Sequence, residues 1–446
     1  MAWLGDSSVP YVGSLVLTVM AAGYANYLSP LLFSDGLTIR GQSLAIVIPL
    51  LGFPVSVVLW WLYRGRRTTS RWLIVFLCGL AASWILHMVL LRIHGDQNNH
   101  LVWLFIPVLA MLLWKTPNSN EAWQAIQIFA WCAVVILVLT RALEMAGMLP
   151  LFRIEQWIIE WEKARYWLPL SGYLGLEGRW PGPFGYNSKT GFISTLLILI
   201  GLARWRRSSI VFVIVGVLGV LLTGGRGAAL ALAAGLFVLV VFAATGPVSR
   251  IPMALRSVLG ALVLVAFGLM FFLSPLGTTG RFGSGGIWDA FVSLWRTSPW
   301  IGVGQTGILA DPKAGISMEA HSLYLQELTR SGVVGFAVQF AVIAVGIAVI
   351  ALAAYRGLAW PLALVTAYYV ASLTEVFQDG WLQHTTYSML LMICVIAADS
   401  FLHVHDSATQ QGVSEPVDQD ESPRIPAEEW TAPPPKSFAK GSNADT

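Results

Sequence analysis

Long runs of apolar residues recur along most of the chain, and the charged residues fall mainly in the segments between them. A helix needs about 20 mostly apolar residues to cross the hydrocarbon core of a bilayer. We expect these segments to be helices, because the bilayer core has no water and each backbone N–H and C=O group must form its hydrogen bond within its own segment. The sequence predicts twelve spans, near residues 11–33, 42–63, 72–91, 100–114, 122–140, 187–203, 209–223, 227–245, 255–274, 332–354, 358–377 and 383–402.

Basic residues collect in the segments that follow the second, sixth, eighth and tenth of these spans. They are Arg64, Arg66, Arg67, Arg71, Arg204, Arg206, Arg207, Arg250, Arg256 and Arg356. Cytoplasmic loops of membrane proteins carry an excess of Lys and Arg. All of these segments are even-numbered connections, so we expect both termini to be cytoplasmic.

The composition supports a membrane protein and narrows the alternatives. The chain has 446 residues, of which 56% are hydrophobic and 11% are charged, and its mean hydropathy is +0.68. A soluble domain carries roughly a quarter charged residues, so a cytosolic enzyme and a disordered chain are both excluded. The net charge of +3 is too small to indicate nucleic-acid binding. Cys78, Cys132 and Cys394 lie inside apolar runs, which predicts neither a disulfide framework nor a zinc cluster.

Two parts of the chain are predicted to differ in character. Residues 1–402 form an all-α polytopic membrane domain, with long outer connections at 141–186 and 275–331. Residues 403–446 are rich in Asp, Glu, Ser and Pro and predict a disordered cytoplasmic tail. The Asp418-Gln419-Asp420 sequence in that tail is interpreted as a solvated acidic run, not as a metal site.

The second outer connection predicts two helices of its own. The apolar residues Ile287, Trp288, Phe291, Leu294 and Trp295 repeat with helical spacing, which is typical of an amphipathic helix. A proline at position 299 ends this helix, and Gly302-Val303-Gly304 predicts a turn. A second helix is expected after Ser317, ending at Gly332 and carrying His321.

Three arginines on the predicted outer side stand apart from the cytoplasmic clusters. Arg226 follows two glycines and is expected to begin the next helix, where its guanidinium would add to the positive end of the helix dipole. Arg281 lies between Gly280 and Gly283, just after the ninth predicted span. Arg179 lies shortly before the sixth predicted span. Anion binding is one interpretation of these residues. The other is that each side chain reaches lipid headgroups at the interface.

His321 is a candidate proton acceptor in the same outer loop. It lies between arginine-bearing segments, with Glu319 and Glu327 nearby in sequence, and an imidazole can accept a proton near neutral pH. The alternative is an ordinary structural histidine on a partly apolar helix. His384, at the outer start of the last span, is a weaker rival.

With these residues in view, the chain resembles the O-antigen ligase and polymerase superfamily of bacterial membrane glycosyltransferases. The resemblance covers roughly residues 178–335. Its pieces, in order, are Gly178-Arg179 with Gly182-x-Phe184, Leu222-Thr223-Gly224-Gly225-Arg226-Gly227, Arg281 with Trp288, Pro299-Trp300-Ile301-Gly302-Val303-Gly304, His321-Ser322-Leu323-Tyr324-Leu325 and Ser331-Gly332-Val333-Val334-Gly335. The chain departs from the family at Gly225, usually Ser, at Ser322, often Asn, and at Tyr186-Asn187-Ser188, where Asn-Pro-Asn is common.

The resemblance implies a GT-C-like fold and the transfer of a glycan from a polyprenyl-diphosphate carrier to a hydroxyl, outside the inner membrane, without a metal or other cofactor. It implies that His321 is the general base, that Arg226 and Arg281 contact the diphosphate, and that Arg179 assists them. The implied partners are the lipid-linked glycan donor, a glycan, lipid or protein acceptor, and membrane lipids.

The chemistry of the leaving group agrees with this implication. A departing diphosphate needs its charge stabilised, and the planar fork of arginine suits phosphate oxygens. The predicted outer loops contain no Asp-x-Asp pair. Back-side attack by one hydroxyl predicts inversion at the anomeric carbon.

Two alternatives remain at this point. A polysaccharide polymerase would use the same donor and differ from a ligase only in its acceptor. A transporter or flippase of lipid-linked sugars would belong to a different class, and it would call for ionisable groups near mid-span and an internal repeat. Neither feature is evident in the sequence.

Overall fold

The computed structural model describes most of the predicted membrane domain. The described residues are 7–32, 43–63, 70–95, 105–146, 180, 182–184, 187–204, 207–243, 250–273, 286–311, 314, 320–373 and 381–413. Their helices are α1 (Val9–Leu32), α2 (Ser43–Leu62), α3 (Arg71–Ile93), α4 (Phe105–Trp114), α5 (Ser119–Met145), α8 (Asn187–Ala203), α9 (Ser209–Thr223), α10 (Arg226–Val241), α11 (Met253–Leu273), α12 (Ile287–Thr297), α13 (Gly304–Ala310), α15 (Leu323–Tyr355), α16 (Ala359–Ala371) and α17 (Trp381–Val413). No strand occurs within these ranges, so the all-α prediction is confirmed for them.

Four helical segments are long and apolar enough to cross a membrane, judged by length and composition. They are Arg71–Ile93, Ser119–Met145, Leu323–Tyr355 and Ser388–Ser407. Shorter apolar helical segments coincide with other predicted spans, among them Ser188–Ala203 and Gly227–Val241. The structure therefore supports a membrane protein, and the count of twelve spans stays a prediction.

The outward faces of several helices expose large apolar side chains, as expected for helices that face lipid. Along α11, for example, Leu255, Val258, Leu262 and Val265 are each at least half exposed. A soluble protein rarely leaves so continuous an apolar surface in contact with water. The distribution of apolar side chains thus agrees with the hydropathy of the sequence.

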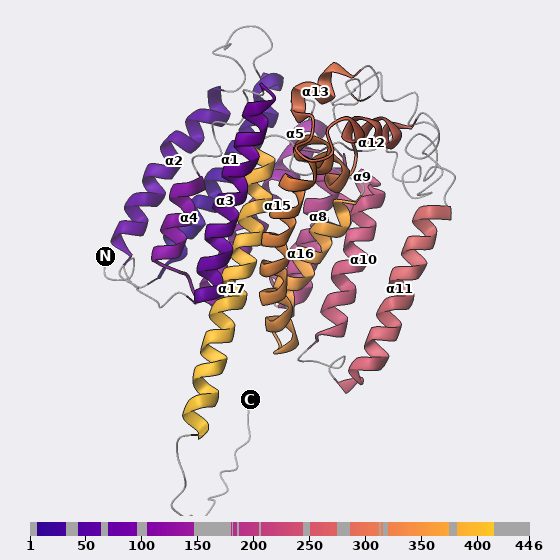
Figure 1. The fold of residues 1–446 in the computed structure, drawn as a ribbon. Helices are drawn as coiled ribbons and strands as arrows, with labels where there is room; N and C mark the ends of the chain where they lie inside the picture. Colours follow the sequence, from indigo (N-terminus) through magenta and orange to yellow (C-terminus); the bar gives the residue numbers. More distant parts are fainter. Residues whose placement is uncertain are drawn as a thin grey trace, which may run out of the picture. The chain divides into compact units, whose positions relative to one another are not determined.

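The centre of the bundle is formed by helices that are buried on all sides. In α8 every residue from Phe192 to Ile200 is buried, and in α17 every residue from Met389 to Ala398 is buried. Helix α8 packs against α9, α10, α16 and α5, and α10 packs along α16 and α11. Figure 1 shows these helices running side by side, with α12 and α13 lying across one end of them.

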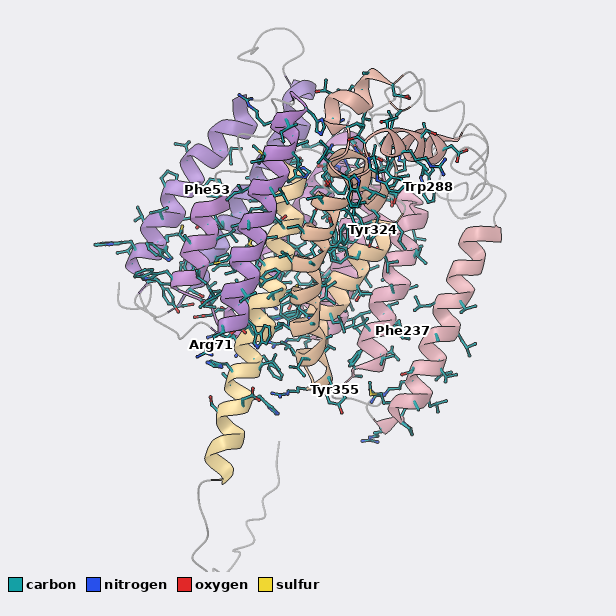
Figure 2. The ribbon with its side chains drawn as sticks, in the orientation of Figure 1. Phe53, Arg71, Phe237, Trp288, Tyr324 and Tyr355 are labelled. Carbon is teal, nitrogen blue, oxygen red and sulfur yellow. The ribbon has the colours of Figure 1, made fainter. Side chains whose placement is uncertain are left out.

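Hydrogen bonds at the opposite end, which we call the basic end, join the starts and ends of helices that are far apart in sequence. Arg204 donates to Asn120, and Ser70, which caps the start of α3, donates to Asp399. Lys115 donates to the carbonyl of Tyr63. Figure 2 shows Arg71 and Tyr355 toward this end, and Trp288 and Tyr324 toward the other.

Two boundaries differ from those predicted. Helix α15 begins at Leu323 and continues to Tyr355 across a non-helical residue, Gly332, so the predicted second loop helix and tenth span form one interrupted helix. His321 precedes this helix, and the expectation that His321 lies on a helix was wrong. Helix α17 continues to Val413, into the segment predicted to be a tail, although the contacts divide the chain into two units after Val404.

Candidate functional site

The end of the bundle under α12 and α13, which we call the loop end, brings together the segments singled out in the sequence. Trp180, the residue after Arg179, donates its backbone N–H to the carbonyl of Leu222 at 3.0 Å. Its indole N–H donates to Glu144 Oε2 at 2.8 Å, and Arg141 pairs with the same carboxylate at 3.2 Å. The end of α5, the start of α8 and the end of α9 therefore meet at Trp180.

Helix α10 begins at Arg226, as the sequence predicted. Gly224 ends α9 in the left-handed conformation, with φ 55°, and Gly225 is the N-cap residue of α10. Gly225 has no side chain with which to cap the first turn, so a bound oxyanion could accept hydrogen bonds from the N–H groups there. The position of the Arg226 side chain lies outside the described part of the chain, as do Arg179 and Arg281.

The turn after α12 interlocks with the break in α15. Gly302 and Gly332 both have positive φ, 74° and 64°, and their backbones lie against each other. A Cβ atom on Gly332 would lie 2.3 Å from the carbonyl carbon of Trp300, and one on Gly302 would lie 2.4 Å from that of Arg330. Val303 N–H donates to Thr329 O at 2.9 Å across this contact. Only glycine fits at both positions.

His321 occupies a tight turn just before α15. Its φ is 50°, and it is the only residue other than glycine with positive φ among those the structure describes. Histidine is one of the few residues enriched in this conformation, which still costs free energy. Ala320, Ser322 and Leu323 are buried, whereas His321 is half-buried. The residue that carries the imidazole is therefore more exposed than its neighbours, although its Nδ1 atom is itself buried.

A continuous series of contacts links the His321 turn to the start of α10. Leu323 N–H donates to Ser372 O, at the end of α16, at 2.9 Å. On the same helix the ring of Tyr368 lies 6.0 Å from that of Phe192 in α8. Two residues after Arg226, the carbonyl of Ala228 accepts a hydrogen bond from Thr195 Oγ1, again in α8, at 3.0 Å. His321 and the start of α10 thus lie at the same end of the bundle.

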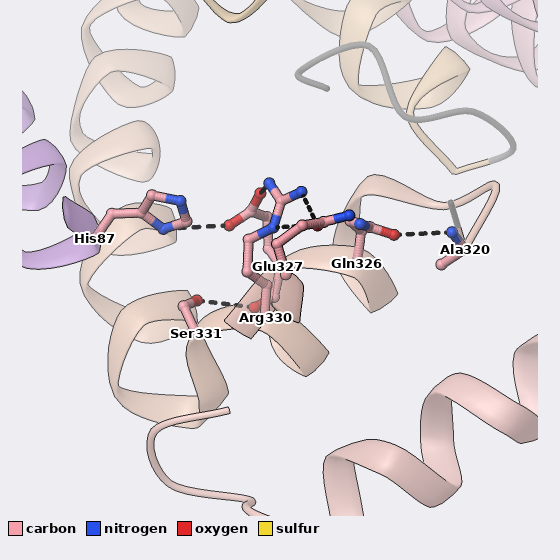
Figure 3. Close-up of polar contacts among 7 residues, drawn as sticks. His87, Ala320, Gln326, Glu327, Arg330 and Ser331 are labelled. Carbon is pink, nitrogen blue, oxygen red and sulfur yellow. Dashed lines mark hydrogen bonds and ion pairs between the residues drawn. The ribbon is translucent and has the colours of Figure 1, made fainter. Parts of the chain in front are cut away.

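A buried charged network that sequence reasoning missed lies beside this turn (Figure 3). Glu327 Oε2 lies 3.6 Å from His87 Nδ1, and Glu327 Oε1 lies 3.7 Å from the Arg330 guanidinium. Arg330 also donates through Nε to Gln305 Oε1 at 3.2 Å. The side chains of Glu327 and Arg330 are only 3% and 9% exposed. Their spacing of three residues in an apolar helix was the available signal, whereas nothing local pointed to His87.

Lys189 is a second residue that the sequence interpretation passed over. It lies in the first turn of α8 and is only 4% exposed. The next residue, Thr190, packs against Gly182, where an added Cβ would lie 2.4 Å from the Thr190 methyl group. This buried lysine lies two residues before Gly191, which packs against Thr223 and Ala228 near the start of α10. Its position within an otherwise apolar span gave no signal in the sequence.

Other predicted residues have a mixed outcome. His384 lies in α17 but its side chain, like Glu319, is outside the described residues. Trp288, Phe291 and the rest of the predicted amphipathic helix form α12, as expected. Within the described ranges, no group of three or more His, Cys, Asp or Glu side chains is placed to hold a metal ion.

Comparison with known proteins adds no assignment to this geometry. No protein-family model matches the chain, and a search of curated proteins finds no match.

Proposed function

We propose that the protein is an O-antigen ligase-like glycosyltransferase of the bacterial inner membrane, with about twelve spans and a GT-C-like arrangement. It transfers a glycan from a polyprenyl-diphosphate carrier to an acceptor hydroxyl on the outer face. The observation that carries this proposal is the contact series from Leu323 through Ser372 and Phe192 to Ala228, which supports a single site containing His321 and the start of α10.

In this proposal, the acceptor oxygen attacks the anomeric carbon from the side opposite the diphosphate. The acceptor hydroxyl proton passes to the His321 imidazole as the new C–O bond forms. The bond between the anomeric carbon and the phosphate oxygen breaks, and its electron pair leaves with the diphosphate. Arg226, Arg281 and Arg179 stabilise the charge of the leaving group, together with the first turn of α10. The anomeric configuration inverts.

The sidedness of the site is supported by the two ends of the bundle. Arg71, Arg204 and Arg356 belong to connections at the basic end, opposite α12 and α13. The distribution of basic residues in membrane proteins favours that end as cytoplasmic, with both termini on the same side. The loop end then faces outward, where a lipid-linked glycan would be available after it has crossed the membrane.

The test is the transfer activity of purified variants in proteoliposomes, with lipid-linked glycan isolated from a strain that lacks the gene. We expect His321→Ala to lower turnover by about 10²–10⁴-fold, the usual contribution of a positioned base. Arg281→Ala should lower it by about 10²-fold or more, as for other groups that stabilise transition-state charge. The matched controls are His94→Ala and Arg296→Ala, at the same end of the bundle.

Near-normal turnover in folded His321→Ala and Arg281→Ala variants would contradict the assigned roles. Retention of the donor's anomeric configuration in the product would contradict the single displacement. Movement of the carrier across the bilayer without a new glycosidic bond would favour a transporter instead.

The acceptor decides between ligase and polymerase, because both reactions use the same donor. We favour the ligase because the arginine- and histidine-bearing segments lie close together in the sequence. In a deletion strain, unattached polymer remaining on its lipid carrier indicates a ligase, and short repeats on the final acceptor indicate a polymerase.

A further inference from the structure

The turn that carries His321 is closed by one buried side chain from α15. Gln326 Oε1 accepts a hydrogen bond from the backbone N–H of Ala320 at 2.8 Å (Figure 3). The N–H of Gln326 donates to Ser322 O at 2.9 Å, which is the first hydrogen bond of α15. These two bonds span the residues on either side of His321. The turn from Ala320 to Ser322 is therefore held against the first turn of α15 by the Gln326 side chain.

Gln326 is an unusual choice if its role were only to fill space. Its side chain is fully buried, and its Nε2 atom has no hydrogen-bond partner among the described residues. A buried amide donor without a partner costs free energy, so an apolar side chain of similar size would serve stability better. What the amide supplies, and an apolar side chain would not, is the acceptor for Ala320.

The segment around Gln326 is rigidly held, which gives that hydrogen bond a fixed base. Tyr324 donates to Tyr369 O at 2.9 Å, and Thr329 Oγ1 donates to Phe291 O at 3.2 Å. The break at Gly332 separates this first part of α15 from the rest of the helix. Gln326 therefore connects this fixed helical segment to the His321 turn, whose left-handed backbone conformation is intrinsically unfavourable.

We infer that Gln326 is the positioning residue of His321: its hydrogen bond to Ala320 holds the turn in the left-handed conformation that presents the imidazole. The inference rests on the proposed function for its catalytic consequence, but the positioning itself is measurable without a substrate. The general expectation is that supporting groups behind a reacting side chain change turnover without greatly changing substrate affinity.

The experiment uses full-length protein in detergent and follows the modification of His321 by diethyl pyrocarbonate, read by peptide mass spectrometry. We expect Gln326→Met and Gln326→Asn each to raise the modification rate at least about threefold, because a released turn opens more often. Gln326→Met keeps the length of the side chain but offers only a weak thioether acceptor, and Gln326→Asn keeps the amide but places it one methylene short of Ala320 N–H. Ser331→Ala, which removes a buried side-chain hydrogen bond to Glu327 O in the same helix but none that the turn depends on, is the matched control and should leave the rate unchanged.

Gln326→Glu retains an acceptor oxygen at the same reach and should restore the wild-type modification rate. In proteoliposomes, Gln326→Met should lower turnover at least about tenfold with the donor KM within about twofold, the pattern of a lost positioning group. A smaller rise in modification in both folded variants, or no rescue by Gln326→Glu, overturns the inference. If Gln326→Met fails to fold, Gln326→Asn decides the outcome. Absence of transfer by the wild-type protein would overturn the proposed function alone, because the modification rates would still report on positioning.

Discussion

At the basic end of the bundle, polar side chains mainly complete the ends of regular helices, whereas at the loop end they hold backbone that has left the helix. Lys115 donates to the carbonyls of Trp60 and Tyr63 at the end of α2. Asn118 and Glu121 form a capping box at the start of α5. These contacts supply hydrogen-bond partners to the N–H and C=O groups that have none within the helix at its two ends, and so they stabilise the helices.

The loop end uses a different set of devices. His321, Gly302 and Gly332 have positive φ, and Glu327 and Arg330 are a buried charged pair. Glycine adopts positive φ without strain, but the left-handed conformation of His321 and the buried charges both cost free energy, and they persist only where the surrounding structure imposes them. The loop end therefore contains a left-handed histidine and a buried charged pair that its packing holds in place, whereas the basic end contains ordinary helix caps.

The largest effect that separates the two ends is expected from Gly332→Ala. The added Cβ would meet the backbone of Trp300 and Ile301 at 2.3–2.4 Å in a residue whose φ is 64°. Neither backbone can move easily, so we expect a loss of about 4 kcal/mol or more in the free energy of unfolding, or failure of the loop end to fold. Thermal unfolding in detergent measures this.

Gly95→Ala is the matched control for that substitution. Gly95 also has positive φ, 77°, but nothing lies within 4 Å of its Cβ position. Only the backbone conformation is then unfavourable, and the expected loss is about 1 kcal/mol. Equal losses for the two variants would show that the interlock between Gly302 and Gly332 contributes little.

A smaller effect is expected from removing one member of the buried charged pair. Glu327→Gln leaves the Arg330 guanidinium without its carboxylate in a site where both side chains are almost fully buried. We expect the free energy of unfolding to fall by about 3 kcal/mol, because an uncompensated buried charge remains. Chemical denaturation in detergent checks this value.

The double variant Glu327→Leu with Arg330→Met serves as the control, because it removes both charges and keeps apolar volume. It should recover most of the loss, as is observed when buried ion pairs are replaced as a unit. A loss in Glu327→Gln of under about 0.5 kcal/mol, the range of exposed pairs, would mean that water reaches the network.

The smallest effect is expected at the basic end, from Lys115→Met. This change removes the donor to Trp60 O at 2.7 Å and the cation above the Trp60 ring at 4.9 Å. Hydrogen bonds from charged groups suggest a loss of about 2 kcal/mol. Turnover per folded molecule should not change, because Lys115 lies far from the loop end.

The control is Arg207→Met, at an exposed residue near the basic end, which should alter the free energy of unfolding by less than about 0.5 kcal/mol. A fall in turnover in folded Lys115→Met protein would contradict the separation of the two ends.

The sequence by itself determined the helices and several of their boundaries, because these depend on short-range properties. Apolar runs predicted the positions of α3, α5 and α8, and the helical spacing around Trp288 predicted α12. Glycine next to Arg226 predicted where α10 begins, since glycine alone readily ends a helix in the left-handed conformation.

Only the tertiary structure decided how the loop end is assembled. Leu323, beside the His321 turn, donates to Ser372 at the end of α16, and Gly332 at the break in α15 lies against Gly302 from another segment. His87 joins Glu327 across a separation of 240 positions in the numbering, 327 minus 87. Contacts of this kind depend on how helices pack in three dimensions, and no local pattern of residues encodes which distant helix a given side chain will meet.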